Sequence, residues 1–88
     1  MKIINITADE AIILQGAIIE SEFLQKRKLK LDLNGDVKKG RLKTEVANWI
    51  KNFSKIEFVG LCAIAAYNRE DEEFLYCAKS IFEKVIGS

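Results

Sequence analysis

The chain has 88 residues, of which 49% are hydrophobic and 31% charged, and its formal net charge is +1. These are ordinary globular values, so the composition argues against a disordered tail and against a membrane protein. A domain of this size buries only about 60–65% of the surface of its unfolded chain, so association with a partner would help to stabilise it. We expect one domain spanning residues 1–88, mainly α, built as a small bundle of about four helices.

The chain opens with a β-favouring run over residues 2–6, which predicts a short N-terminal strand or an extended segment. A long helix should follow, because Thr7 and Glu10 have the spacing of a capping box, in which each side chain bonds the other residue's backbone N–H. This helix is expected to end at about Lys28, where the basic residues begin. Gly16 costs about 1 kcal/mol relative to Ala inside a helix, so another helix should approach closely there.

Apolar residues on this first helix are too numerous for the single stripe that one covered face requires. They are Ala11, Ile12, Ile13, Leu14, Ala17, Ile18, Ile19, Phe23 and Leu24. The surplus would form an exposed patch of the kind that marks an interface, centred on Ile12, Ile13 and Ile19. We therefore expect a homo-oligomer that associates through these residues, with a dimer favoured.

Residues 29–40 alternate apolar and polar side chains around Asn34-Gly35, the dipeptide that most strongly indicates a tight hairpin turn. A small β-hairpin is one prediction for this segment. With a two-residue turn Leu33 would face Asp36, so neither face of the ribbon would be cleanly apolar. A loop is the alternative.

Basic residues are concentrated in residues 26–43, where eight cations and two acidic residues give a net charge of +6, which leaves −5 for the rest of the chain. The eight are Lys26, Arg27, Lys28, Lys30, Lys38, Lys39, Arg41 and Lys43. Surfaces that neutralise phosphates are built in this way, which predicts binding of nucleic acid or of a phosphorylated ligand. No aromatic residue lies among them to stack on bases, and a solvated, charge-rich loop is the alternative.

An amphipathic helix is predicted over residues 41–53, and Trp49 falls in register with its apolar stripe, so Trp49 should belong to the core. If the helix begins near residue 40, Lys38, Lys39 and Arg41 surround its first turn. The free N–H groups and the positive end of the dipole at that point favour an anion.

Residues 54–67 contain the longest uncharged run of the chain. Ser54 and Glu57 form a second capping box, and residues 58–67 carry no charge at all. This pattern predicts a central helix that is covered on all sides. Gly60 inside it predicts a second close contact between helices.

The last predicted helix is capped by Asn68, has acidic residues at 70–73 in its first turn, and ends at Gly87. Acidic residues in a first turn complement the helix dipole and need no partner. A docking surface for a basic partner is the alternative role of these residues.

Catalytic and metal-binding groups are scarce. The sequence has no His, no nucleophile elbow and no glycine-rich phosphate loop, so we predict a protein that is not an enzyme and has no cofactor. Asp32, Asn34 and Asp36 alternate like the ligands that open a calcium loop of the EF-hand type. Val37 stands where that loop needs glycine and Lys43 where it needs a closing carboxylate, so no metal site is predicted.

Cys62 and Cys77 lie at similar distances on either side of the turn near Asn68, so the two helices that flank it could bring them together in the core. We expect a reduced buried pair, with a disulfide as the alternative, because the acidic N-terminus has no secretory pattern and predicts a cytoplasmic protein.

These features predict a small non-enzymatic interaction protein, an adaptor, regulator or stoichiometric inhibitor, that self-associates and binds another macromolecule. A protein partner is expected, and no contact with a membrane. Binding of nucleic acid through the basic residues is the alternative function. Frequent Ile, Lys and Asn, with His and Pro absent, is typical of AT-rich bacterial genes and of their plasmids and phages, so a mobile-element origin is predicted.

Overall fold

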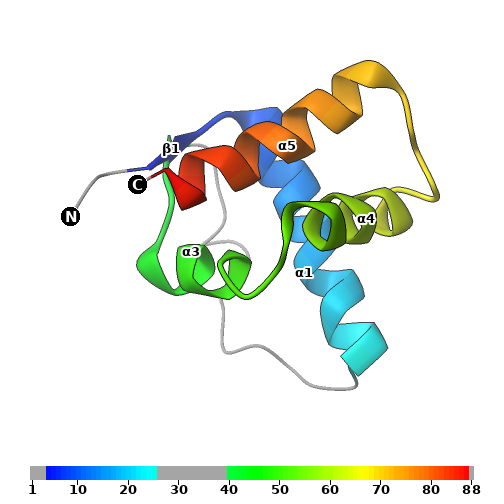
Figure 1. Ribbon diagram of the computed structural model, residues 1–88, viewed down its shortest axis with the longest axis horizontal. Helices are drawn as coiled ribbons and strands as arrows, with labels where there is room; N and C mark the ends of the chain where they lie inside the picture. Colours follow the sequence, from blue (N-terminus) through cyan, green and yellow to red (C-terminus); the bar gives the residue numbers. More distant parts are fainter. Residues whose placement is uncertain (1–3, 26–39, 88) are drawn as a thin grey trace.

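The computed structural model describes residues 4–25 and 40–87 of the chain. In chain order, their elements are β1 (Asn5–Ile6), α1 (Ala8–Gln25), β2 (Gly40–Arg41), α3 (Thr44–Ile50), α4 (Lys55–Ala65) and α5 (Glu72–Ile86). The mainly helical fold that the sequence predicts is confirmed. In Figure 1, α5 lies above α4 while α1 runs downward behind α4, and α1 packs against both of these helices.

One hydrophobic core joins the four described helices. Its most deeply buried large side chains come from α1, α3, α4 and α5, and they are Leu14, Ile18, Val46, Ile50, Phe58, Ile81 and Val85. Trp49 is half-buried at the edge of this core, with its ring 5.1 Å from that of Phe53 and 6.4 Å from that of Phe58. Trp49 therefore packs with the core, as predicted, although it is not enclosed by it.

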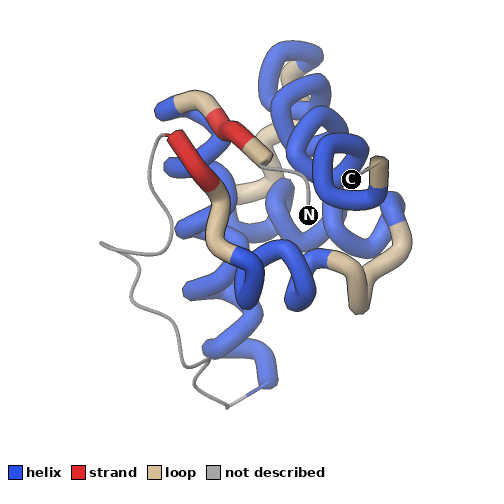
Figure 2. Tube along the Cα trace, turned by 90° about the vertical axis from the view of Figure 1, so that its left-hand side faces the viewer, coloured by secondary structure: helices blue, strands red, loops and turns tan. Residues whose placement is uncertain are grey.

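β1 and β2 form a short antiparallel pair beside the helices, as the two strands in Figure 2 show. Asn5 pairs with Arg41 and Ile6 with Gly40. Gly40 has φ of +112°, a conformation that L side chains rarely adopt, which explains a glycine at this position. The N-terminal strand predicted within residues 2–6 is confirmed at Asn5–Ile6, while residues 2 and 3 lie outside the described residues. The hairpin predicted around Asn34-Gly35 also lies outside them.

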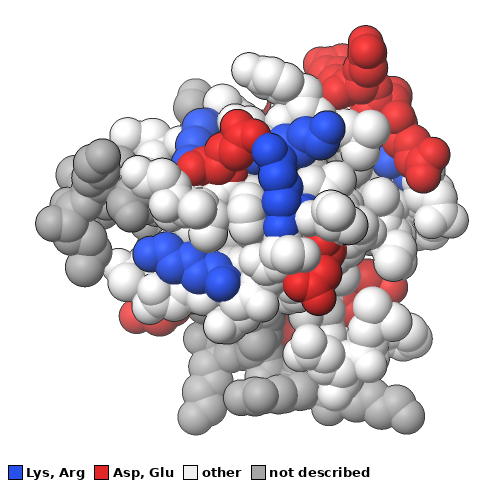
Figure 3. All heavy atoms as spheres, in the orientation of Figure 1, with Lys and Arg blue, Asp and Glu red and all other residues white. Residues whose placement is uncertain are grey.

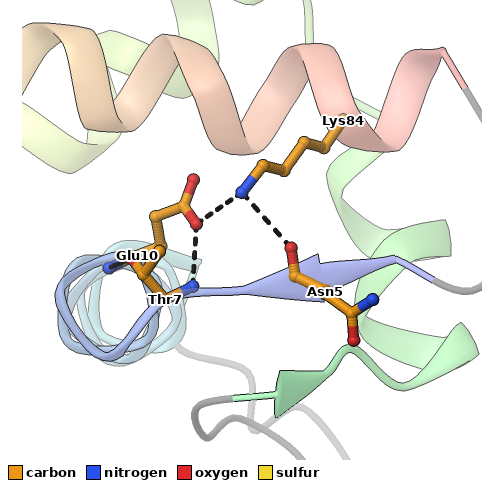
Figure 4. A network of polar contacts seen from close by, with 4 residues as sticks. All are labelled: Asn5, Thr7, Glu10 and Lys84. Atoms are coloured by element: carbon orange, nitrogen blue, oxygen red, sulfur yellow. Dashed lines mark hydrogen bonds and ion pairs between the residues drawn. The ribbon is translucent and has the colours of Figure 1, made fainter.

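The start of α1 is fixed by the predicted capping box and by a lysine from the far end of the chain (Figure 4). The Thr7 N–H donates to the Glu10 carboxylate at 2.8 Å, and the Glu10 N–H donates to the Thr7 hydroxyl at 3.1 Å. Lys84 of α5 donates to the same carboxylate at 2.7 Å and to the Asn5 carbonyl at 3.2 Å. Glu10 is 2% exposed, so this network holds a buried charge between β1, α1 and α5.

The prediction of a helix over residues 41–53 is wrong at both ends, since α3 covers only Thr44–Ile50. Arg41 is extended because it pairs with β1, and Lys43 is the N-cap residue without a side-chain cap. After Ile50 the chain turns toward the Ser54 cap of α4. A helix of seven residues that begins at Thr44 does not provide the anion-binding first turn predicted beside Lys38 and Lys39.

The prediction that the helix after Ser54 is covered on all sides is also wrong. Its capping box with Glu57 is present, but only Phe58, Leu61 and Cys62 of α4 are buried. Ile56 is 86% exposed and Ile64 50% exposed on its outer face. α4 packs on α1 and α5 from one side, and no described element covers the other side.

The two helical glycines differ in their surroundings. A Cβ on Gly16 would lie 3.7 Å from the Cβ of Ala65, so α4 approaches α1 closely there, as predicted. A Cβ on Gly60 would meet nothing within 4 Å, so the close contact predicted at Gly60 is wrong.

α5 is capped by Asp71 rather than by Asn68. The Asp71 carboxylate accepts a hydrogen bond from the Phe74 N–H at 2.8 Å. Tyr67 and Asn68 instead have positive φ values of 59° and 63° and reverse the chain between α4 and α5. Asparagine tolerates this left-handed conformation better than most residues, and this explains why it serves the turn and not the cap.

We expect Lys84→Met to lower the free energy of unfolding by about 1–3 kcal/mol, because the buried Glu10 carboxylate would lose its charged donor. The measurement is urea denaturation at neutral pH. Lys79→Met is the matched control, since Lys79 is an exposed lysine of the same helix and should change the stability by less than about 0.5 kcal/mol. Equal effects of the two substitutions would contradict a specific role for Lys84.

The same network predicts a loss of stability in acid. Burial raises the pKa of Glu10, but the hydrogen bonds from Lys84 and Thr7 and the charge of Lys84 outweigh it, so the pKa lies below its ordinary value of 4.5. The stabilisation by Glu10 is therefore complete at pH values above the pKa of Glu10 in the unfolded chain. It is lost as the pH falls through the lower pKa of Glu10 in the folded protein. Glu57, Asp71 and Glu83 have lowered pKa values as well, so only a comparison with Glu10→Gln isolates the contribution of Glu10. Between about pH 6 and pH 3, the wild type should lose more free energy of unfolding than Glu10→Gln.

Gly60→Ala should raise the free energy of unfolding by about 0.5–1 kcal/mol, because alanine restricts the unfolded chain and finds open space in the folded one. Gly40→Ala is the opposite case and should destabilise the fold, since φ at Gly40 is +112°. Thermal or urea unfolding checks both. A destabilised Gly60→Ala variant would mean that Gly60 is tightly covered in solution, by another part of the chain or by a second copy.

Candidate functional site

The outer side of α1 carries an apolar stripe that no described element covers. Ile12, Ile19 and Phe23 are 67%, 54% and 77% exposed, and their spacing of seven and four residues puts them on one side of the helix. The buried residues Leu14 and Ile18 lie on the other side. α1 is therefore apolar on two opposite faces, and only one of them belongs to the core.

The outer side of α4 has a similar stripe at a spacing of four residues, formed by Ile56, Gly60 and Ile64. Leu24 of α1 is 56% exposed and lines a groove with these three residues, with a volume of about 330 Å³. We call Ile19, Phe23, Leu24, Ile56 and Ile64 the outer apolar surface. Contiguous exposed apolar groups of this kind mark interaction sites more often than scattered single ones do.

A second concave site lies between α1, α4 and α5, with a volume of about 480 Å³. We call it the α1/α5 cleft. Its apolar lining is formed by Ile12, Ile13, Gly16, Ala65, Ala66 and Phe74. Its charged lining consists of Asp9 from the first turn of α1, Glu73 from the first turn of α5, and Arg69 from the turn before α5.

The charges of this cleft are mainly negative. Arg69 forms an ion pair with Asp71 outside the lining, and its guanidinium lies 5.6 Å from the centre of the Phe74 ring. The Asp71 carboxylate raises the pKa of Arg69. The positive charge of Arg69 is thus largely offset by Asp71. Asp9 and Glu73 therefore give the cleft a net negative charge.

Both cysteines are free thiols that line the α1/α5 cleft. Burial raises the pKa of the Cys62 thiol to about 12. The pKa of Cys77, which is half-buried, is raised by burial and then by the charges of Glu10, Asp9 and Glu73. Both thiols should therefore stay protonated near neutral pH, and neither is poised as a nucleophile.

The three interface residues that the sequence predicts do not all belong to one concave site in the structure. Ile12 and Ile19 are exposed, whereas Ile13 is half-buried and packs against the core. Ile12 and Ile13 line the α1/α5 cleft, and Ile19 lies outside it. Association through these residues stays a prediction.

Most of the predicted basic surface lies outside the described residues, namely Lys26, Arg27, Lys28, Lys30, Lys38 and Lys39. Of the other two, Arg41 belongs to β2 and Lys43 is exposed before α3. Binding of nucleic acid through these eight residues stays a prediction, and its expected signature is an affinity that falls steeply with salt.

In the part of the chain that the structure describes, no group of three or more His, Cys, Asp or Glu side chains is placed to hold a metal ion. Within the same residues, no helix combines the length and the apolar character that crossing a membrane requires.

Sequence reasoning missed that Asp9 and Glu73 line the same cleft, and it missed the outer stripe of α4. The i, i+4, i+8 spacing of Ile56, Gly60 and Ile64 was a signal for that stripe, since it marks one side of a helix. No local signal could place Asp9 near Glu73, because their proximity depends on how α1 packs on α5.

Comparisons with known protein families, curated proteins and solved structures found no match. The two surfaces described above are thus the main guide to function.

Proposed function

We propose that this protein is a small non-enzymatic interaction protein that self-associates and acts by binding another protein, as adaptors, regulators and stoichiometric inhibitors do. The observation that carries this proposal is the outer apolar surface. Single exposed apolar side chains are normal on a soluble monomer, whereas here Leu24, Ile56 and Ile64 line one groove, and Ile19 and Phe23 add further exposed apolar side chains on α1.

The energetics support association through this surface. Fully burying a large aliphatic or aromatic side chain contributes about 1.5–3 kcal/mol, and these five side chains are 50–86% exposed. A symmetric dimer would bury these five side chains in both copies, so the gross gain in free energy is on the order of 10–20 kcal/mol. Association itself costs about 4–15 kcal/mol, and a micromolar dimer needs a surplus of about 8 kcal/mol. Burial of this surface can therefore supply the free energy that a dimer with a micromolar dissociation constant requires.

Symmetry favours a dimer over larger assemblies. A twofold axis brings the same patch of two copies together, so one self-complementary surface is sufficient and the assembly closes. α1 and α4 supply the stripes and the groove that such a patch needs, since side chains of one copy can enter the groove of the other.

We expect the wild type to have twice the 10.0 kDa mass of one chain in light scattering at micromolar concentration. Ile19→Ser combined with Phe23→Ser should give a monomer that is still folded, because both side chains are more than half exposed and lie outside the core.

The matched control is Tyr76→Ser combined with Ile86→Ser on α5. Tyr76 and Ile86 are 74% and 51% exposed, close to the 77% of Phe23 and the 54% of Ile19, and they lie outside the outer apolar surface. The control should remain a dimer. A monomeric wild type, or dissociation by both pairs of substitutions alike, would contradict the proposed interface.

A further inference from the structure

We propose that the α1/α5 cleft is a docking site for a basic, amphipathic segment of a partner protein, which places apolar side chains in the cleft and Lys or Arg against Asp9 and Glu73. This inference rests on the proposed function and names the chemistry of the partner. It concerns a surface other than the one proposed for self-association.

The shape of the cleft suits side chains of a partner. Its volume of about 480 Å³ lies within the range of about 300–1,000 Å³ that is usual for binding sites. Small residues keep it open, since Gly16, Ala65 and Ala66 line the wall where α4 crosses α1. Ile12 is 67% exposed at this cleft, so a partner would remove a large apolar side chain from water.

The negative charge of the cleft favours a partner segment that is positively charged. Asp9 and Glu73 come from different helices and line the same cleft, and Glu10 lies near its Cys77 wall. Each acidic side chain complements the dipole of its own helix, but helix dipoles do not require Asp9 and Glu73 to face one cleft. Lys84 is bonded to Glu10, and Arg69 is paired with Asp71, so the cations near the cleft are already engaged. A cationic partner is attracted to this arrangement and an anionic one is repelled.

The extent of the negative surface favours a protein segment over a small amine. Acidic side chains gather over the start of α5 in Figure 3, where Glu72 and Glu73 occupy the first turn of the helix. One small cation would meet only Asp9 and Glu73. A segment with several cations on the flanks of an apolar face would use the cleft and the surface beside it, in the way that amphipathic helices bind grooves.

The test uses two synthetic 18-residue peptides on the full-length Ile19→Ser, Phe23→Ser background, which keeps self-association out of the measurement. One peptide is an amphipathic helix with Leu on one face and Lys on the flanks, and the other has Glu in place of every Lys. Fluorescence anisotropy gives the dissociation constants. Alkylation of Cys77 by iodoacetamide at alkaline pH, where part of the thiol is ionised, followed by peptide mass spectrometry, reports occupancy of the cleft, because Cys77 lines it.

We expect the Leu/Lys peptide to bind and to slow the alkylation of Cys77 by about tenfold at a concentration ten times its dissociation constant. The Leu/Glu peptide should give neither effect. Asp9→Asn combined with Glu73→Gln should weaken binding by roughly tenfold at low salt. Ile12→Ser should weaken it at every salt concentration, because the contact it removes is apolar. Glu45→Gln on α3 is the matched control and should bind normally.

Four results would overturn the inference. The two peptides could bind equally well, or the Leu/Lys peptide could bind without protecting Cys77. Glu45→Gln could also weaken binding as much as Asp9→Asn combined with Glu73→Gln. Protection of Cys77 in the concentrated wild type without peptide would also overturn it, because a second copy would then occupy the cleft. Each of these results leaves the light-scattering test of the proposed function intact, so the failure of one proposal can be told from the failure of the other.

Discussion

The buried carboxylate of Glu10 is the interaction on which the arrangement of this fold depends. It accepts from the Thr7 N–H at the start of α1 and from Lys84 near the end of α5, while Lys84 also reaches the Asn5 carbonyl of β1. A charge that is 2% exposed must be paired and hydrogen-bonded, so α1 and α5 cannot slide past each other without leaving it unsatisfied. The register that this network fixes is what places Asp9 and Glu73 at one cleft.

The exposed apolar surfaces follow from the small size of the chain. With α1 and α5 fixed, α4 packs across both from one side, and the absence of a side chain at Gly16 lets it approach α1 closely. The core closes around Phe58, and no described element remains to cover the opposite face of α4. A larger domain would add another layer there, whereas a chain of this length leaves the face to solvent or to a partner.

Local rules predicted the features whose causes are local. Both capping boxes are present, because each depends on side chains three residues apart. Several features that depend on tertiary packing were predicted wrongly. Arg41 was predicted to begin a helix but pairs with β1. α4 carries no charge from Phe58 onward, which predicted cover on all sides, but only one side of it meets the core. The cleft could not be predicted, because Asp9 and Glu73 are far apart in the sequence and line the same cleft only through the register of α1 on α5.

The two proposed surfaces adjoin on α1. Ile12 lines the cleft and Ile19 belongs to the outer apolar surface, and seven residues of helix separate them by only about 10 Å along one side. A helix bound in the cleft has a diameter of about 10 Å itself, so its edge would reach the neighbourhood of a second copy docked at Ile19. If both surfaces are used, the two binding events share α1 and are thermodynamically linked. Linkage is reciprocal, so a partner that weakens self-association by a given factor is itself bound more weakly by the dimer by that same factor.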